Sequence, residues 1–180
     1  MADKIEELII HIAHKSENDP SFGLTKLNKI LFASDFFHFG YYGKSITGES
    51  YVHRERGPVP KMMVESLQNL GSSGRIQISE RLYYGYPQKR VIPLSGANLS
   101  EFNKEEVALV ENIIEQFKNF NGRALSEWTH QQLPWLVTDE GHEIPYSSVF
   151  VLRKLPVEKA GIEWAEKELE KLGMDKAYAN

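Results

Sequence analysis

Cysteine is absent from the 180-residue sequence. Without it the chain can form no disulfide, no thiolate nucleophile and no thiolate zinc site, and its absence fits a reducing cytoplasm. The sequence also lacks any apolar run that approaches the ~18 residues of a membrane span. Residues 1–15 are acidic and helical in pattern, without the basic region of a secretory signal. We therefore expect a cytoplasmic protein that has no contact with a membrane.

Basic residues are too few to cover the surface with positive charge. The chain has 21 Lys and Arg against 25 Asp and Glu, and the formal net charge of −4 argues against affinity for nucleic acid over the whole surface. The charge is unevenly distributed, however. Residues 51–93 contain seven basic and three acidic residues, so this segment is net basic while the remainder is net acidic. A partner with an acidic patch would be attracted to the basic segment.

Hydrophobic residues make up 41% of the chain, which is enough for an ordinary buried core. The strongest helical pattern covers residues 24–39, where Leu24, Leu27 and Ile30 recur at helical spacing and several phenylalanines widen the apolar face. A helix that is apolar around so much of its circumference belongs at the centre of the core. Further helices are expected at residues 3–15, 61–70, 101–120 and 123–133, with a C-terminal amphipathic helix in residues 157–180.

Two short alternating runs, residues 75–79 and 88–93, predict a β-hairpin with a longer loop that contains three tyrosines. Residues 50–55 are extended in pattern. We expect these three segments to form one small sheet beside the helices, and residues 135–150 to be irregular. With no repeat and no linker, the sequence predicts an α+β, α-rich fold with a helical core and a small antiparallel sheet, as a single domain over residues 1–180.

Three stretches, taken together, resemble the Panacea domain, which is also called the SocA-like antitoxin domain. The first is residues 24–51 and includes Lys29, the second is the turn at residues 56–59, and the third is residues 124–135 followed by residues 139–144. The resemblance covers residues 5–146 and rests on the order and spacing of the stretches. The positions that carry the family pattern, to which the resemblance assigns a structural role, are Lys26, Leu27, Leu31, His38, Gly57, Pro58, Ser126, His130 and Trp135.

The resemblance implies an antitoxin, phage-associated and prokaryotic, that neutralises a toxin encoded nearby by binding it directly. It implies no enzyme activity and no cofactor, and it does not identify the toxin. Two positions depart from the family pattern, because Arg56 stands where an aromatic residue is usual and Asp35 where a neutral polar residue is common. Residues 72–100 match no part of the pattern, so the resemblance says nothing about contacts made there.

The most enzyme-like group consists of Ser126, Glu127 and His130, since a serine, a histidine and an acid can form a catalytic triad. Ser126 and His130 are four residues apart on one predicted helix, however, which suits a local hydrogen bond better than a strained nucleophile turn. We interpret His130 as hydrogen-bonded at a helix junction, with Trp135 filling the core beside it. We therefore predict no catalytic residue.

Three histidines, His11, His14 and His38, could in principle hold a metal ion through their imidazole nitrogens. The chain has no H-E-x-x-H pattern on a helix to support such a site, and we predict no metal.

The C-terminal helix, with Trp164 toward the body of the domain, could form a contact between two copies of the chain in a homodimer. The sequence leaves the oligomeric state open.

The tyrosines of the hairpin stand beside basic residues, and tyrosine and arginine are enriched in protein contact surfaces. We predict that the hairpin and the extended segment before it bind the partner protein. The alternative is that one or two of the tyrosines fold back onto the domain. The predicted partner-binding residues are Arg54, Arg56, Arg81, Tyr83, Tyr84, Tyr86, Lys89 and Arg90.

A helix followed by a basic hairpin is also the order of a winged helix, which makes a DNA-binding regulator the alternative function. The helix at residues 61–70 offers only Lys61 and Glu65 as charged residues, and no row of Arg or Asn that would read base edges. Its exposed side would neutralise few phosphates. A protein partner is therefore the favoured prediction over nucleic acid.

Overall fold

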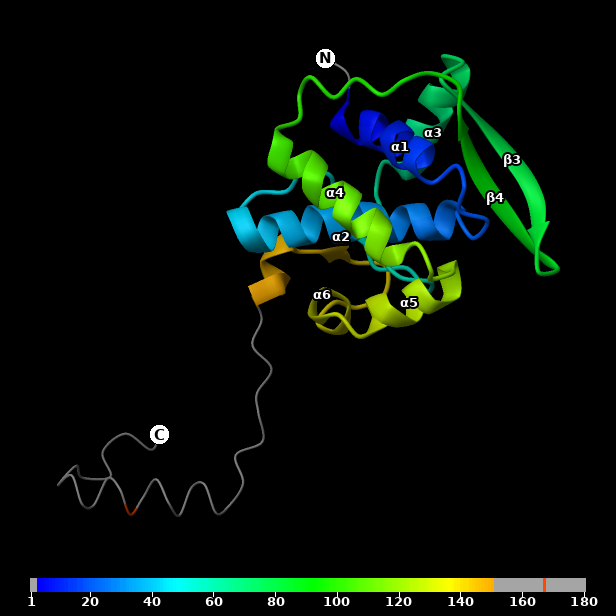
Figure 1. Cartoon of the computed structure of the whole chain (residues 1–180). Helices are drawn as coiled ribbons and strands as arrows, with labels where there is room; N and C mark the ends of the chain where they lie inside the picture. Colours follow the sequence, from blue (N-terminus) through cyan, green and yellow to red (C-terminus); the bar gives the residue numbers. More distant parts are fainter. Residues whose placement is uncertain (1–2, 151–166, 168–180) are drawn as a thin grey trace.

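Helix α2 (Leu24–Tyr42) runs through the middle of the molecule in the computed structural model, which describes residues 3–150 and 167 (Figure 1). Helices α1 (Lys4–Lys15) and α4 (Lys104–Phe117) lie on one side of it, and α5 (Gly122–His130) and the short α6 (Leu133–Leu136) lie on the other. Because elements cover α2 on both sides, its sequence needs little polar face. The prediction of a central helix from residues 24–39 is confirmed.

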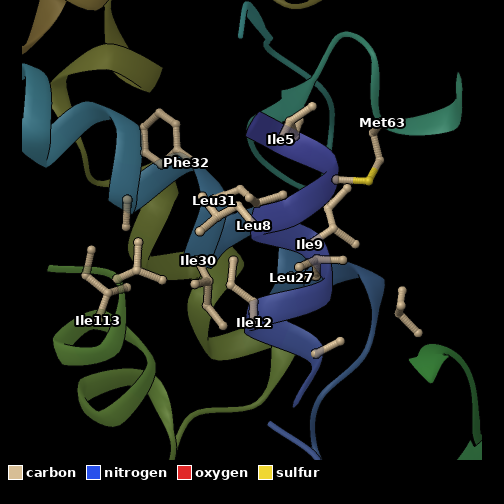
Figure 2. Packing of buried hydrophobic residues seen from close by; sticks show 14 of the residues in the cluster. Ile5, Leu8, Ile9, Ile12, Leu27, Ile30, Leu31, Phe32, Met63 and Ile113 are labelled. Carbon is tan, nitrogen blue, oxygen red and sulfur yellow. The ribbon is translucent and has the colours of Figure 1, made fainter. Parts of the chain in front are cut away.

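One part of the core forms where α1 packs on α2. Helix α1 begins at Asp3, whose side chain accepts a hydrogen bond from the backbone N–H of Ile5 at 3.4 Å and so satisfies a free donor of the first turn. Its apolar residues follow the predicted helical stripe and are all buried. Figure 2 shows this stripe against buried residues of α2; the two sets are Ile5, Leu8, Ile9 and Ile12 from α1, and Leu27, Ile30 and Leu31 from α2.

Helix α4 is fixed at its start by a capping box. The side chain of Asn103 accepts from the backbone N–H of Glu106, and the carboxylate of Glu106 accepts from the backbone N–H of Asn103. The same carboxylate is buried, and it forms an ion pair with the Lys4 ammonium group at 3.0 Å. The start of α4 is thereby tied to the start of α1, which sets how the two helices lie across α2.

Strands β1 (Tyr51–Val52), β2 (Val59–Pro60) and β5 (Glu143–Ile144) form one antiparallel sheet in the order β2-β1-β5. Strands β3 (Ile76–Tyr83) and β4 (Tyr86–Pro93) form a separate two-stranded hairpin. The prediction of one sheet from residues 50–55, 75–79 and 88–93 is therefore wrong. Strand β1 pairs with β2 across the turn at residues 53–58, and with β5, whose two residues give no strand pattern in the sequence.

The hairpin is longer and its loop shorter than the sequence predicted. Its ladder continues without interruption to the pair Tyr83 and Tyr86, so only Tyr84 and Gly85 form the turn. Both have positive φ, 48° and 81°, which is the conformation of a type I′ turn. Tyrosine rarely occupies such a position, so the pair Tyr84-Gly85 gave little turn signal in the sequence. The eight consecutive cross-strand pairs hold the turn in place.

Helix α3 (Met63–Ser72) leads from the small sheet to the hairpin, two residues later than predicted at each end. The segment 135–150, predicted to be irregular, includes β5 and the 3-10 helix η1 (Tyr146–Phe150). The predicted C-terminal helix at residues 157–180 lies outside the described residues, apart from Lys167. The α-rich α+β class is confirmed. Among the described helices, none has both the length and the apolar character to cross a membrane.

Candidate functional site

The tip of the hairpin is the most exposed aromatic surface among the described residues. Tyr84 is 87% and Tyr86 77% exposed, and Leu82 beside them is 74% exposed. Tyr83 is half-buried, and its ring meets that of Tyr84 edge-on with 4.8 Å between centroids. The hairpin extends beyond the helical body (Figure 1). Two of the three predicted tyrosines are thus fully open to a partner, and the third turns toward the domain.

The basic side chains near the tip are largely engaged within the hairpin. Lys89 pairs with Glu80 on the opposite strand at 3.1 Å. Arg81 donates to the side chain of Gln88 and to the carbonyl of Pro20, both at 2.8 Å. Both cations remain exposed, so a partner can still reach them, but their charge is partly balanced or held in place.

Arg90 is not a surface residue, which corrects its predicted place among the partner-binding residues. The residue is 5% exposed, and its guanidinium packs over the ring of Phe22. Burial lowers the pKa of Arg90, yet the group keeps its donors paired with backbone oxygens of the loop between α1 and α2. These acceptors are the carbonyls of Ser16 at 2.8 Å, Glu17 at 2.6 Å, Asp19 at 2.6 Å and Phe22 at 3.3 Å.

Arg90 therefore anchors the hairpin to the body. The alternation of side chains along β4 indicates that Arg90 and Lys89 cannot lie on the same surface. They are neighbours in a strand, so their side chains point to opposite faces. The composition of residues 51–93 suggested one basic surface, but the pleat of the strand places neighbouring basic side chains on opposite faces of the hairpin. Gly23 completes the anchor, because a β-carbon there would lie 2.7 Å from the Gln88 side chain and 3.1 Å from the Lys89 carbonyl.

Arg54 and Arg56 lie on the turn that joins β1 to β2, not on the hairpin. Both are exposed, while Gly57 and Pro58 behind them are buried. The carbonyl of Arg56 accepts a hydrogen bond from the Ser126 hydroxyl of α5 at 2.9 Å. The structure thus brings two of the three family motifs together, and it places these two arginines on a surface of their own beside α5.

Beneath this turn lies the buried ammonium group of Lys29, from α2. This ammonium group makes only a long hydrogen bond, 3.5 Å to the carbonyl of Pro58, within the described residues, and burial lowers the pKa of Lys29 to about 7. Gly57 has φ of +104°, and a β-carbon there would collide with Lys29 and lie 2.7 Å from the Thr129 hydroxyl. The glycine of the family turn is therefore required for both its backbone conformation and the space it leaves.

Trp135 stacks on His130, with 4.4 Å between ring centroids, and also contacts the ring of His53. The Ser126 hydroxyl donates to the carbonyls of Arg56 and Gly122. The expected hydrogen bond between Ser126 and His130 is thus absent, and the buried Nε2 of His130 has no hydrogen-bond partner among residues 3–150 and 167. Burial, with the nearby Lys29 charge second, lowers the pKa of His130. Trp135 is half-buried, so it covers this junction and does not fill the core.

The remaining family-motif residues hold the central helix in place. Leu27 and Leu31 are fully buried in the core. Lys26 is buried as well, and it pairs with Asp19 at 2.5 Å and donates to the carbonyl of Phe120 at 2.7 Å. It therefore joins the loop before α2 to the loop after α4, a role that only a long cation with several donors fills. Nδ1 of His38 bonds the carbonyl of Lys44 at 2.6 Å and closes the end of α2.

Asp35, noted in the sequence only as a departure from the family pattern, is the centre of a buried hydrogen-bond network. Its carboxylate accepts from the backbone N–H groups of Ile46 and Thr47, each at 2.8 Å, from the Thr47 hydroxyl at 2.6 Å and from the Tyr51 hydroxyl at 2.7 Å. Burial raises the pKa of Asp35, and the four donors oppose that shift. The network fixes the chain after α2 onto β1. No local sequence signal predicts it, because its donors lie 11 to 16 residues away.

Two concave regions adjoin these surfaces. A polar cleft of about 500 Å³ lies between the loop after α1, the end of α4 and Tyr83 at the hairpin tip. An apolar groove of about 340 Å³ lies at the other end of α2, between Phe37, Tyr41, Trp128 and Phe150. The cleft lies beside the hairpin tip, and the groove lies where the described chain leaves η1.

The three histidines considered for a metal have separate partners. His11 faces Glu111 at 3.5 Å, His14 bonds Glu17 and the carbonyl of Ser95, and His38 bonds Lys44 as above. Burial lowers the pKa of His11. Within residues 3–150 and 167, no group of three His, Cys, Asp or Glu side chains is arranged to hold a metal ion.

A sequence model for the family described as "Antitoxin SocA-like, Panacea domain" matches residues 27–136, which is more than half of the chain. The match includes the central helix, the Gly57-Pro58 turn, the hairpin and the His130–Trp135 junction. It also spans residues 72–100, where the sequence showed no resemblance to the family pattern. No curated protein and no solved structure gives a significant match.

Proposed function

Since the chain belongs to the SocA-like family of Panacea antitoxin domains, we propose that it neutralises a protein toxin by direct contact. The observation that carries this proposal is the projecting hairpin, whose tip exposes Tyr84, Tyr86 and Leu82 while Arg90 fixes its base. An anchored strand pair loses little conformational entropy when it binds. Less of the favourable contact free energy is therefore offset than in a flexible loop. Tyrosines add a large apolar area and a polar end that tolerates water before binding.

The charges of residues 51–93 contribute less to recognition than their number suggests. Arg75 forms two hydrogen bonds with the buried carboxylate of Glu7, Lys89 pairs with Glu80, and Arg90 is buried. The exposed cations outside these pairs are Arg54, Arg56, Lys61 and Arg81, and only Arg81 lies on the hairpin. We propose that the aromatic tip contributes more to affinity than these charges do, and that an acidic patch on the toxin chiefly speeds encounter.

We propose further that the protein acts in the cytoplasm, without a cofactor, and that its role ends in binding and not in turnover. The exposed tip of the hairpin offers contact area but no converging acid, base and nucleophile. The Ser126 hydroxyl, which belonged to the most enzyme-like group of the sequence, is occupied by two backbone carbonyls.

The test is co-expression of the chain with the product of the adjacent reading frame, scored by growth rescue and by affinity purification of a complex. The wild-type chain should relieve toxicity and carry the partner through purification. Tyr84→Ala with Tyr86→Ala should weaken binding by about tenfold or more, because the loss of a single aromatic anchor worth ~1.4 kcal/mol already lowers affinity tenfold. Rescue without any complex would argue against neutralisation by contact.

The matched control is Tyr41→Ala, which removes a tyrosine of similar exposure, 73%, at the far end of α2. Binding should stay at the wild-type level in this variant, and all variants should keep the wild-type melting temperature within about 2 °C, as exposed substitutions usually do. A chain that forms no complex but retains duplex DNA in a salt-sensitive manner would favour the winged-helix alternative.

A further inference from the structure

We propose that the outer edge of β3 is the recognition element and that it binds an extended segment of the toxin as an added antiparallel or parallel strand. This inference rests on the proposed antitoxin function and specifies how the partner is held. In β-strand addition, main-chain hydrogen bonds supply affinity, and alternate side chains supply specificity.

The edge of β3 is unpaired in the part of the chain that the structure describes. Strand β4 lies on the inner side of the hairpin and contacts α1 and α2, whereas β3 lies on the outer side and contacts α3 only near its start (Figure 1). Between Gln77 and Tyr83 every residue of β3 is exposed or half-buried. The ladder to β4 runs through eight successive pairs without a bulge.

The alternation of the ladder identifies which backbone groups face outward. The N–H of Leu94 donates to the carbonyl of Arg75 at 2.8 Å, so these two residues form a hydrogen-bonded pair. In an antiparallel ladder such pairs alternate, so the odd-numbered residues of β3 bond to β4. The even-numbered residues then direct their N–H and C=O groups away from β4. Those on the open part of the edge are Ile78, Glu80 and Leu82.

The two prolines of β4 agree with this assignment. Pro87 lies opposite Leu82 and Pro93 opposite Ile76, both in the class of pairs that exchanges no ladder hydrogen bonds. A proline lacks the N–H that the other class would need, so it is tolerated only there. Natural edge strands are commonly protected by a proline, a bulge or a short length. Strand β3 has eight residues and neither of the other two features, while both prolines are in β4.

The side chains beside the open backbone groups define the occupant. Ile78, Glu80 and Leu82 share one face of the strand, because residues two apart point the same way. Ile78 is 38% exposed, Leu82 is more exposed still, and Glu80 lies between them. In a complementary segment, apolar residues would lie opposite Ile78 and Leu82, and a basic residue at the position between them would lie opposite Glu80.

A second copy of this chain fits the edge poorly. Two β3 strands paired symmetrically about their centre would place Glu80 opposite Glu80 of the second copy. Like charges directly opposite are destabilising, and the exposed pair of each Glu80 with its own Lys89 offsets this only in part. Shifting the register by one step places Glu80 opposite Ile78, which leaves an acid facing an apolar residue. The charge of the edge therefore favours a partner segment with its own basic residue.

The decisive variant is Glu80→Pro, measured for binding to the co-expressed toxin by titration calorimetry. Proline removes one outward N–H and puts its ring in the path of an added strand, while it leaves the ladder to β4 intact. Glu80→Ala is the matched control, because it removes the same carboxylate and the same pair with Lys89 but keeps the N–H. Glu80→Pro should weaken binding by about a hundredfold or more, and Glu80→Ala by no more than about fivefold.

Hydrogen exchange of the wild-type complex provides a second measurement that does not depend on the variant's folding. The amides of Ile78, Glu80 and Leu82 should exchange at least about tenfold more slowly in the complex than in the free protein, since an added strand would bond them. Unchanged exchange at all three, or Glu80→Pro binding like Glu80→Ala, would overturn the strand-addition proposal while the antitoxin function still stood.

A wild-type chain that neither binds nor rescues would instead refute the proposed function itself. Sedimentation of the free protein tests whether a second copy of this chain occupies the β3 edge. A dimer that Glu80→Pro converts to monomer would assign the edge to a second copy and overturn the proposal. A free protein that stays monomeric in both forms supports it.

Discussion

The backbone of Gly57 lies directly against the buried ammonium group of Lys29, so that the turn between β1 and β2 closes over a charge of the central helix. This contact joins two family motifs that are 28 positions apart in the sequence. On its exposed side the same turn presents Arg54 and Arg56, and on its inner side it covers Lys29 and the Thr129 hydroxyl.

Gly57→Ala should destabilise the protein strongly, because the added methyl group meets Lys29 and Thr129 and the backbone φ is +104°. We expect a loss of about 3 kcal/mol or more in the free energy of unfolding, from strain and overpacking together. Urea unfolding followed by circular dichroism measures it. Gly48→Ala is the control, since Gly48 also has positive φ but no atom within 4 Å of the new carbon, and only ~1–2 kcal/mol should be lost.

Lys29 should make stability depend on pH above neutrality. Its pKa is about 7 in the folded protein and ordinarily 10.5, so between these values the unfolded chain binds one more proton than the folded one. Stability therefore rises with pH from about 7 toward 10.5, by up to ~1.4 kcal/mol per unit. Below pH 7 both states are protonated and the penalty for the buried charge is present in full.

Urea unfolding at pH 7, 8 and 9 tests this, compared between the wild type and Lys29→Met. The free energy of unfolding of the wild type should rise relative to that of Lys29→Met as the pH rises, because methionine does not titrate. A constant difference across this range would show that Lys29 stays charged in the folded protein, through contacts stronger than its long bond to Pro58.

Arg90→Ala should loosen the hairpin from the body. The substitution removes the buried guanidinium that donates to the carbonyls of Ser16, Glu17 and Asp19 and leaves a cavity over Phe22, and we expect a cost of about 2–4 kcal/mol. Lys89→Ala, which breaks only an exposed ion pair, should cost less than ~1 kcal/mol. Thermal melts and hydrogen exchange of β4 amides distinguish the two. Equal stabilities would mean that the hairpin does not depend on Arg90 as its anchor.

Leu27→Ala should cost about 2–5 kcal/mol, since Leu27 is fully buried between α1 and α2 and its removal leaves a cavity. Leu82→Ala, at an exposed position, should change stability by less than ~0.5 kcal/mol. Denaturant unfolding of both variants gives the comparison. A Leu27→Ala protein as stable as the wild type would contradict the central position of α2.

Some parts of the candidate site could be predicted from the sequence and others could not. The hairpin follows from a local pattern of alternation, and the structural role of Gly57 follows from the family resemblance. The exposure of Tyr84 and Tyr86 was one of two alternatives that the sequence left open. The burial of Arg90 follows from the strand pleat only when the body to which the hairpin attaches is known. The stacking of His130 on Trp135 could not be derived from their spacing, because α5 ends between them and the chain changes direction.

The helices that pack through periodic apolar stripes can be predicted from the sequence alone, because helix spacing fixes which side chains share a face. Tertiary structure alone decided the pairing of β5 with β1, the network around Asp35 and the open outer edge of β3. Each of these depends on segments brought together from distant positions, and the residues involved are common ones that have no local preference for the partners they meet. Burial and the need to pair buried polar groups select those partners once the chain is folded.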